Sequence, residues 1–196
     1  MSKTGQLFVL SAPSGCGKTS VLAELFKKDR SILRCVTYTT RPPRPDEKNG
    51  VDYHFLSKDE FEKRKNSGFF LEWAQVYGNF YGTSGDDVNR LLAGGKDVML
   101  SVDVQGARTI RGKREAVLIF LVPPSIEELK RRLAKRGTET PEVVERRLRE
   151  AEGEMKQVSL YDYTVVSDTV ENCTQNVLNL VTIEREKRSK NYEHSH

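Results

Sequence analysis

The chain has 196 residues, of which 37% are hydrophobic and 31% charged, a balance that indicates one folded domain and excludes a disordered chain. The net charge of +4 is too small and too scattered to indicate a nucleic-acid groove, and it fits either a solvated surface or arginines directed at anionic ligands. The longest apolar run, residues 116–122, is too short to span a bilayer, and no cleavable signal pattern is present, so we expect a cytoplasmic protein without membrane or nucleic-acid partners.

Residues 6–11 form an apolar run that predicts a strand, and small residues then lead into a helical pattern over 18–28. Two further apolar runs, 98–102 and 117–122, are also each followed by a helical segment, and Ser125 with Glu128 predicts the start of the second of these helices. Near-continuous apolar strands are typical of a parallel sheet covered on both faces. The repeated strand–helix units therefore predict a doubly wound α/β core.

The middle of the chain interrupts this rhythm. The segment 41–45, Arg-Pro-Pro-Arg-Pro, cannot lie inside a helix, because proline lacks the amide donor. Strand-like runs at 51–56 and 69–77, with a helix at about 57–66 between them, predict a small mixed-sheet subdomain inserted over about 36–90. A charged flap follows over 136–147 and leads into a helix to about 158, a strand at 163–166 and a closing helix at 172–188.

Residues 12–19 read Ala12-Pro-Ser-Gly-Cys-Gly-Lys-Thr19 and match the phosphate-loop pattern G-x-x-x-x-G-K-[ST] except at Ala12. Gly15 and Gly17 let the backbone curl so that its amides point toward an anion, and the helix dipole adds to this effect. Lys18 would bridge the β and γ phosphates, and the Thr19 hydroxyl would bind Mg²⁺. The alternative is a structural glycine-rich turn. The motif predicts a P-loop NTPase core with the ATP-binding residues Ala12, Pro13, Ser14, Gly15, Cys16, Gly17, Lys18, Thr19 and Ser20.

Cys16 lies inside this loop at the start of a helix, a place that stabilises a thiolate. We interpret it as a bystander whose alkylation would block ATP binding, the alternative being a catalytic nucleophile. Cys16, Cys35 and Cys173 show no C-x-x-C spacing, and such sparse cysteines are typical of a reducing compartment.

Six further segments resemble the guanylate kinase family in order and spacing. They are Thr37-Tyr-Thr-Thr-Arg-Pro-Pro-Arg, Asn49-Gly-Val-Asp-Tyr-His-Phe, Phe70-Leu-Glu-Trp-Ala-Gln, Gly78-Asn-Phe-Tyr-Gly-Thr, Asp103-Val-Gln-Gly and the lid signature Arg136-Gly-Thr-Glu-Thr. The resemblance runs from about residue 6 to 188. It implies an enzyme that converts GMP to GDP, and also phosphorylates dGMP, with ATP as the phosphate donor and Mg²⁺ as the cofactor.

The resemblance assigns the GMP site to Thr37, Arg41, Arg44, Tyr53, Glu72, Tyr81, Thr83 and Asp103. Arginines and tyrosine hydroxyls suit a phosphate, which offers three acceptor oxygens. Glu72 would accept both the N1–H and the 2-amino group of guanine, whereas adenine presents an acceptor at N1. Without the resemblance, the arginines would read as solvated, the tyrosines as packing residues and Glu72 as a surface position on an alternating strand.

The resemblance also implies that Arg132, Arg136 and Arg147, together with Lys18 and Arg41, neutralise the phosphoryl group in transfer. Ser167 and Asp168 match positions that touch adenine, where the family more usually has Asn-Asp. Asp103 is a candidate to bind Mg²⁺ through water. Ser101 departs from the family, which usually has an acidic residue there, and this weakens the expected discrimination between bases.

The GMP phosphate is already mostly ionised at pH 7, so the expected reaction needs no general base. We expect a core of about 1–35, 91–135 and 159–190, a GMP-binding subdomain of about 36–90 and a helical lid of about 136–158, all within one guanylate kinase-like domain over 1–196. Closure of the subdomain and lid would exclude water. The residues specify no oligomeric state.

Three other interpretations compete. A guanylate-kinase-like interaction module would lack a working phosphate loop, whereas Gly17, Lys18 and Thr19 are intact here. A phosphate-loop kinase for another small substrate is favoured only by Ser101. A nucleic-acid-binding NTPase would need a basic-aromatic surface, which the sequence does not indicate.

Overall fold

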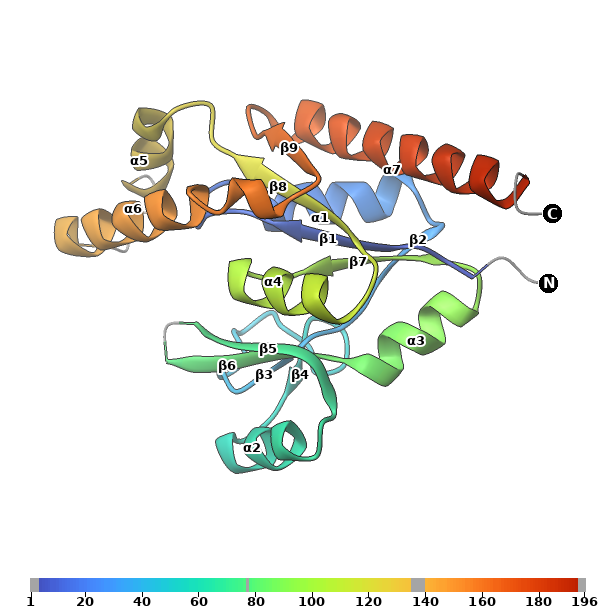
Figure 1. Cartoon of the computed structure of the whole chain (residues 1–196). Coiled ribbons are helices and arrows are strands. Elements are labelled where there is room, and N and C mark those ends of the chain that lie inside the picture. Colours follow the sequence, from blue (N-terminus) through green and yellow to red (C-terminus); the bar gives the residue numbers. More distant parts are fainter. Residues whose placement is uncertain (1–3, 77, 135–139, 194–196) are drawn as a thin grey trace. The chain divides into compact units, whose positions relative to one another are not determined.

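The computed structural model describes residues 4–76, 78–134 and 140–193 (Figure 1). The chain forms two compact units. Unit 1 comprises Met1–Val9 and Ser31–Val117, and unit 2 comprises Leu10–Arg30 and Leu118–His196. The division therefore runs through the first strand, β1 (Leu7–Ser11), after Val9.

Unit 1 holds the elements from the second strand to the fourth helix, together with the first residues of β1. They are β2 (Ile32–Arg34), β3 (Tyr38–Thr39), β4 (His54–Phe55), α2 (Lys58–Asn66), β5 (Phe70–Val76), β6 (Asn79–Ser84), α3 (Gly85–Ala93), β7 (Asp97–Ser101) and α4 (Val104–Lys113). Unit 2 holds α1 (Lys18–Lys28), most of β8 (Val117–Val122), α5 (Ile126–Ala134), α6 (Pro141–Met155), a 3₁₀ turn (Val158–Leu160), β9 (Tyr163–Val166) and α7 (Val170–Glu193).

The larger sheet has the strand order β2-β7-β1-β8-β9, with β2 parallel to β7 and β8 parallel to β9. Two of its inner strands are buried on both faces: all five residues of β1 and the first five of β8 are buried. In unit 2, α1 and α7 lie side by side (Figure 1), and α7 also contacts β9. The predicted α/β core with a parallel sheet and flanking helices is confirmed.

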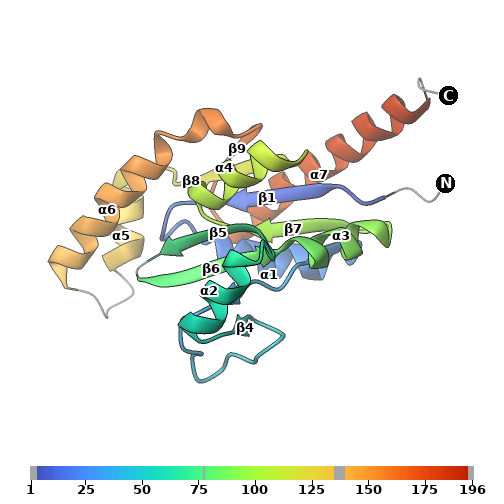
Figure 2. The same cartoon turned by 60° about the horizontal axis from the view of Figure 1, so that its bottom comes forward.

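The smaller sheet lies wholly in unit 1 and has the order β4-β3-β6-β5. Its pairing is mixed, because β3 is parallel to β4 and antiparallel to β6. β5 and β6 form an antiparallel pair and lie side by side in Figure 2. Tyr38, Phe61 and Phe70 form the buried centre of an aromatic cluster that packs α2 against this sheet, and the rings of Phe61 and Phe70 stack at 4.4 Å between centroids. The predicted second, mixed sheet is therefore confirmed.

The strand predicted over 51–56 is wrong in extent, because β4 covers only His54–Phe55. Val51 lies in a turn and is exposed. Two side chains hold the backbone around Val51 in this turn. Asp52 accepts a hydrogen bond from the Lys48 amide at 2.8 Å, and Asn49 accepts one from the Phe55 amide at 3.0 Å. Such local bonds compete with the strand ladder for the same backbone groups.

Several helices begin at a side-chain cap. Ser57, Ser84 and Asp103 accept a hydrogen bond from a backbone amide in the first turn of α2, α3 and α4. Ser125 does the same for α5 by accepting from the Glu128 amide at 3.1 Å, which confirms the predicted cap. None of the described helices is both long enough and apolar enough to cross a membrane.

Candidate nucleotide-binding sites

The loop between β1 and α1 has the curled backbone that the phosphate-loop pattern predicts. Gly15 and Gly17 have φ angles of 93° and 73°, in the left-handed region that favours glycine. A Cβ on Gly15 would come within 2.9 Å of the Leu133 side chain and would force it to shift, but it is chiefly the left-handed backbone that favours glycine here. Cys16 donates its backbone amide to the carbonyl of Pro13 at 3.2 Å, which closes the turn between the two glycines and the strand.

The start of α1 differs from the starts of α2 and α3. Its N-cap is Gly17, and within the described residues no side chain caps it and no acidic residue lies in its first turn. The other two helices have both a serine cap and two acidic residues there. An uncapped helix start leaves backbone N–H groups and the positive end of the helix dipole for an anion. Thr19 and Ser20 at this end are exposed, and Lys18 is half-buried.

Cys16 does not have the environment expected from the sequence. Its residue is fully buried against Leu129, Leu133, Val144 and Ala151. Burial raises the pKa of its thiol to about 12 and outweighs the opposing effect of Arg132. The expectation of a stabilised thiolate is therefore wrong, because desolvation in an apolar cluster exceeds the influence of the helix start.

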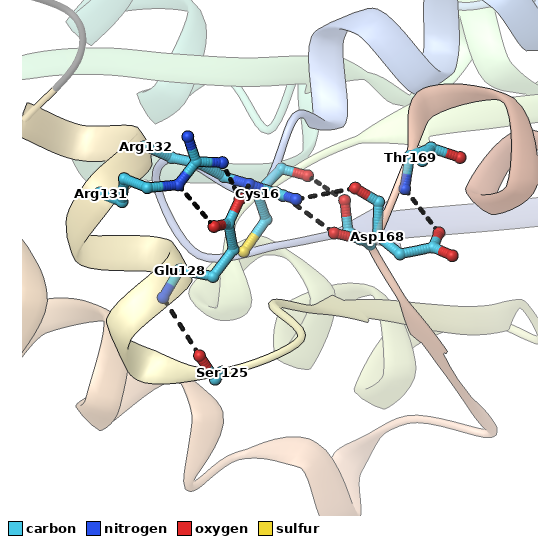
Figure 3. Close-up of polar contacts among 8 residues, drawn as sticks. Cys16, Ser125, Glu128, Arg131, Arg132, Asp168 and Thr169 are labelled. Carbon is cyan, nitrogen blue, oxygen red and sulfur yellow. Dashed lines mark hydrogen bonds and ion pairs between the residues drawn. The ribbon is translucent and has the colours of Figure 1, made fainter.

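The hydrogen-bond partners of Arg132 on α5 lie in unit 2. Its Nε donates to Glu128 Oε1 at 2.7 Å, and its two terminal nitrogens donate to the carbonyls of Ser167 at 2.9 Å and Asp168 at 2.8 Å (Figure 3). Glu128 also accepts two bonds from Arg131, and these arginines lower the pKa of its carboxyl to about 2. Glu128 therefore binds two arginines rather than completing the cap at Ser125.

The residues after β9 lie against the phosphate loop. The Ser167 hydroxyl donates to the carbonyl of Cys16 at 2.7 Å, and Ser167 is buried. Asp168 is exposed, and hydrogen bonds from Asn172 and the Thr169 amide lower the pKa of its carboxyl. The structure thus brings Ser167 and Arg132 to residues 12–20, as their proposed roles in one site require. Arg147 lies half-buried on α6, and Arg136 lies outside the described residues.

Glu72 is the most deeply buried carboxylate of the predicted GMP site, with an exposed fraction of 3%. On β5, Phe70, Glu72 and Ala74 are buried, whereas Trp73 is 42% exposed. The Thr83 hydroxyl on β6 donates to Glu72 Oε1 at 2.5 Å. Burial raises the pKa of Glu72 to about 7, partly opposed by the Thr83 hydrogen bond. The alternative of a surface position is excluded, because the pleat turns Trp73 outward and Glu72 inward.

Gly106, in the first turn of α4, leaves the space that Glu72 occupies. A Cβ at this position would lie 2.6 Å from Glu72 Oε2, closer than real contacts allow. The same turn is capped by Asp103, whose Oδ1 accepts from the Gly106 amide at 2.8 Å. Asp103 therefore has a helix-capping role that the sequence interpretation did not include. Ser101, where the family usually has an acidic residue, is exposed at the end of β7.

Arg41, Tyr53 and Tyr81 lie close together: Tyr81 is on β6, whereas Arg41 and Tyr53 lie outside the strands. The Arg41 guanidinium lies 5.4 Å from the centre of the Tyr53 ring, and the rings of Tyr53 and Tyr81 lie 6.2 Å apart. Tyr81 and Thr83 are two residues apart on β6, so both face the side of the sheet that carries Glu72. Arg44 is exposed and donates its backbone amide to the Glu47 carboxylate. The carbonyl of Thr37 accepts from the His54 amide at the start of β4.

Glu47 is a residue of this site that sequence reasoning missed. Its carboxylate accepts from Arg41 Nη2 at 2.7 and 2.9 Å and from the Arg44 amide at 2.8 Å. The Arg41 hydrogen bond is the largest cause of the lowered pKa of Glu47. A carboxylate thus occupies donors that a phosphate would use. The spacing Arg41-x-x-Arg44-x-x-Glu47 is the signal that could have indicated it, as the four-residue spacing of Glu128 and Arg132 on one helix could for that pair.

Comparison with known proteins finds similarity over nearly the whole chain. Residues 4–184 match the family model described as guanylate kinase. The chain is 46% identical to the guanylate kinase of Alkalilimnicola ehrlichii over 93% of its length and 91% of that protein, and 47% identical to that of Neisseria gonorrhoeae over 96% and 92%. The crystal structure of guanylate kinase from Anaplasma phagocytophilum superposes with a TM-score of 0.77 at 31% identity, covering 93% of this chain and 87% of that one.

The curled loop, the uncapped helix and the parallel sheet define a phosphate-loop nucleotide kinase fold. The extent of the matches places the chain more narrowly: it belongs to the guanylate kinase family.

Proposed function

We propose that this protein transfers the γ-phosphoryl group of ATP to GMP and releases GDP and ADP in purine nucleotide metabolism. The observation that carries the base specificity is the buried carboxylate of Glu72, which stands with the Thr83 hydroxyl on the sheet face that also carries Tyr81. Along a strand, residues two apart are about 7 Å apart, which suits a ligand with a base at one end and a phosphate at the other.

The base end of the site favours guanine over adenine. Guanine presents two adjacent donors, N1–H and the 2-amino group, to an ionised Glu72, whereas adenine turns an acceptor toward the same oxygens. The mismatch leaves a buried charge without its partners, which costs about 1–3 kcal/mol or more. These proposed contacts do not involve the 2′-hydroxyl of the sugar, so we extend the proposal to dGMP.

At the phosphate end, the GMP phosphate takes the place of Glu47 on Arg41. Both groups are anions that accept paired hydrogen bonds from a guanidinium. The hydroxyls of Tyr53 and Tyr81 would bind the GMP phosphate beside Arg41. Arg44 and Thr37, which precedes β3, are further candidates for contacts to GMP. Asp103 stays a proposed contact to GMP or to metal-bound water.

At residues 12–20, the backbone amides and Lys18 bind the phosphates of ATP, and Ser167 and Asp168 flank the loop. A phosphate oxygen of GMP forms a bond to the γ-phosphorus, the bond from that phosphorus to the β-bridging oxygen breaks, and ADP leaves with the electron pair. The attacking phosphate is ionised at pH 7 and needs no base. Arg132, Arg136, Arg147, Arg41 and Lys18 would offset the negative charge that collects there.

Mg²⁺ would enter with ATP. This cation takes one or two protein oxygens and otherwise phosphate and water oxygens. The exposed hydroxyl of Thr19 beside the phosphate loop suits that donor set, and among the described residues no cluster of three His, Cys, Asp or Glu side chains could hold a metal by itself. When bound, Mg²⁺ would neutralise phosphate charge.

We also propose the division into a core, a GMP-binding subdomain over about 36–90 and a lid over about 136–158, whose closure would keep water from the γ-phosphate. The four strands of the smaller sheet fall within residues 38–84, which supports the proposed subdomain.

The three cysteines are free and buried, as in proteins kept in a reducing cytoplasm.

The test is ADP release with ATP, Mg²⁺ and a panel of GMP, dGMP, AMP, CMP and UMP. We expect strong release with GMP, weaker release with dGMP and little with the others. Lys18→Ala is the matched inactive control, since it removes the cation of the phosphate loop. Equal rates with AMP and GMP, or release that does not depend on any monophosphate, would contradict the proposal.

A further inference from the structure

The hydroxyl of Ser167 reaches across 151 residues of sequence to a backbone carbonyl inside the phosphate loop. It donates to the Cys16 oxygen at 2.7 Å, and both residues are buried. A Cβ placed on Gly17 would lie 3.9 Å from the same Ser167 oxygen. The serine side chain therefore stands directly behind the peptide bond that joins Cys16 to Gly17.

This peptide bond carries an amide of the loop. In a trans peptide, the C=O of one residue and the N–H of the next point in opposite directions from a rigid plane. A donor that holds the Cys16 carbonyl therefore also fixes the direction of the Gly17 N–H. Because Gly17 has a φ of 73° and no Cβ, its own conformational preferences leave that plane free to rotate.

Ser167 is itself fixed on both sides. Its amide donates to the Val122 carbonyl at 2.8 Å, which continues the register of β8 and β9. Its carbonyl accepts from Arg132, which Glu128 holds in turn (Figure 3). The hydroxyl is thus presented from a rigid strand end, and water has no access to replace it at the buried Cys16 carbonyl.

We propose that Ser167 is a positioning residue of the phosphate loop, and that its hydroxyl turns the Gly17 N–H toward the bound phosphates by holding the Cys16 carbonyl. The proposal rests on the proposed binding of ATP at residues 12–20. It assigns Ser167 a role that acts on the phosphates, whereas a contact with adenine would act on the base alone. Arg132 binds the carbonyl of Ser167 and is held by Glu128, so both residues act on the loop through Ser167.

The test is calorimetric titration of the full chain with ADP, inorganic tripolyphosphate and GMP. Ser167→Ala removes the hydroxyl, and Ser167→Cys keeps nearly the same volume with only a weak donor. A lost hydrogen bond to a buried carbonyl corresponds to about a tenfold change in affinity. We expect both variants to bind ADP and tripolyphosphate about tenfold more weakly and to bind GMP as the unchanged protein does. Ser167→Thr, which keeps a hydroxyl, should restore most of the affinity.

Thr174→Val is the matched control, because the buried Thr174 hydroxyl also donates to a backbone carbonyl, that of Val170 at 2.6 Å, but lies within α7. It should lower the melting temperature about as much as Ser167→Ala without weakening tripolyphosphate binding. In steady state, Ser167→Ala should raise the KM for ATP and leave the KM for GMP unchanged.

Two outcomes would overturn the proposal. If ADP binds more weakly while tripolyphosphate binds as before, Ser167 acts on the base and not on the loop. If Ser167→Ala and Ser167→Cys bind both ligands normally, the hydroxyl does not position the Gly17 amide. Failure of the unchanged protein to bind either ligand would instead refute the ATP site itself.

Discussion

Glu72 and Thr83 face each other across the antiparallel pair of β5 and β6, and the Thr83 hydroxyl donates to Glu72 Oε1 at 2.5 Å. One oxygen of the carboxylate is thereby engaged by the sheet, while the other lies against the first turn of α4 at Gly106. The pKa of this carboxyl near 7 should affect the stability of the protein and, if Glu72 binds the base as proposed, the binding of GMP.

Binding of GMP should tighten as the pH rises from 6 to 8. Guanine offers two donors to Glu72, so the ionised carboxylate is the binding form, and a pKa near 7 makes its ionised fraction rise about tenfold across this range. Equilibrium titrations of GMP at several pH values measure this change. Glu72→Gln is the control, because ionisation of the ligand phosphate remains while the change due to Glu72 disappears. Parallel pH profiles for the two proteins would refute the role of Glu72.

Glu72→Gln should stabilise the unliganded protein at high pH. Burial raises the folded-state pKa from 4.5 to about 7, so between these values the folded protein holds a proton that the unfolded chain has lost. The free energy of unfolding of the unchanged protein therefore falls as the pH rises through this window, by on the order of 3 kcal/mol. Urea unfolding at pH 5 and pH 8 should show the two proteins diverging. Glu60→Gln, an exposed change on α2, should produce no comparable divergence.

Arg41→Met should raise the KM for GMP about 10- to 100-fold and change the KM for ATP little. The change removes a charged donor from the phosphate and leaves Glu47 without its main partner, so that its carboxylate repels the ligand. Steady-state rates measure both constants. The double variant with Glu47→Gln should recover part of the loss.

Arg90→Met is the control for Arg41→Met, because Arg90 forms an exposed ion pair with Asp87 in the same unit. It should leave both Michaelis constants unchanged. An unaltered KM for GMP in Arg41→Met would remove this arginine from the site.

The folded protein should resist alkylation at all three cysteines. Burial raises the pKa of Cys16 and Cys35 to about 12 and that of Cys173 to about 11, and only the thiolate reacts. Mass spectrometry after iodoacetamide treatment at pH 7.5 should find little adduct in the native protein and three adducts in urea. Rapid modification of Cys16 alone in the native protein would show that its environment is open.

The elements with strong patterns were predicted with nearly their observed bounds. β8 is strongly apolar, α1 is long, β9 consists of the strand-forming residues Tyr, Thr and Val, and the loop at residues 12–19 has a fixed residue pattern. β2 and β3 have three and two residues, too few to establish a period, and their pairing depends on distant strands. The helix α3 was missed although Ser84 and Asp87 give it a capping signal.

The candidate sites, too, could be predicted from the sequence only in part. Residue types that suit an anion were evident in the motif, but the orientation of Glu72 was not, because Leu71 and Trp73 are as apolar as its inward-facing neighbours Phe70 and Ala74. The state of Cys16 depends on α5 and α6, more than 100 residues away in sequence. Burial depends on how the chain packs. A local sequence pattern shows which side chains are buried only where polar and apolar residues alternate clearly.

At the proposed GMP site, the ion pair between Glu47 and Arg41 would compete with any anion that binds Arg41. Free inorganic phosphate and other small anions must displace an intramolecular carboxylate, which is present at high effective concentration, and they gain nothing at Glu72. A guanine nucleotide engages both ends at once, so its base offsets the cost of displacing Glu47. Small anions such as inorganic phosphate should therefore bind weakly to Arg41. A guanine nucleotide, which also binds Glu72, should not be excluded in this way.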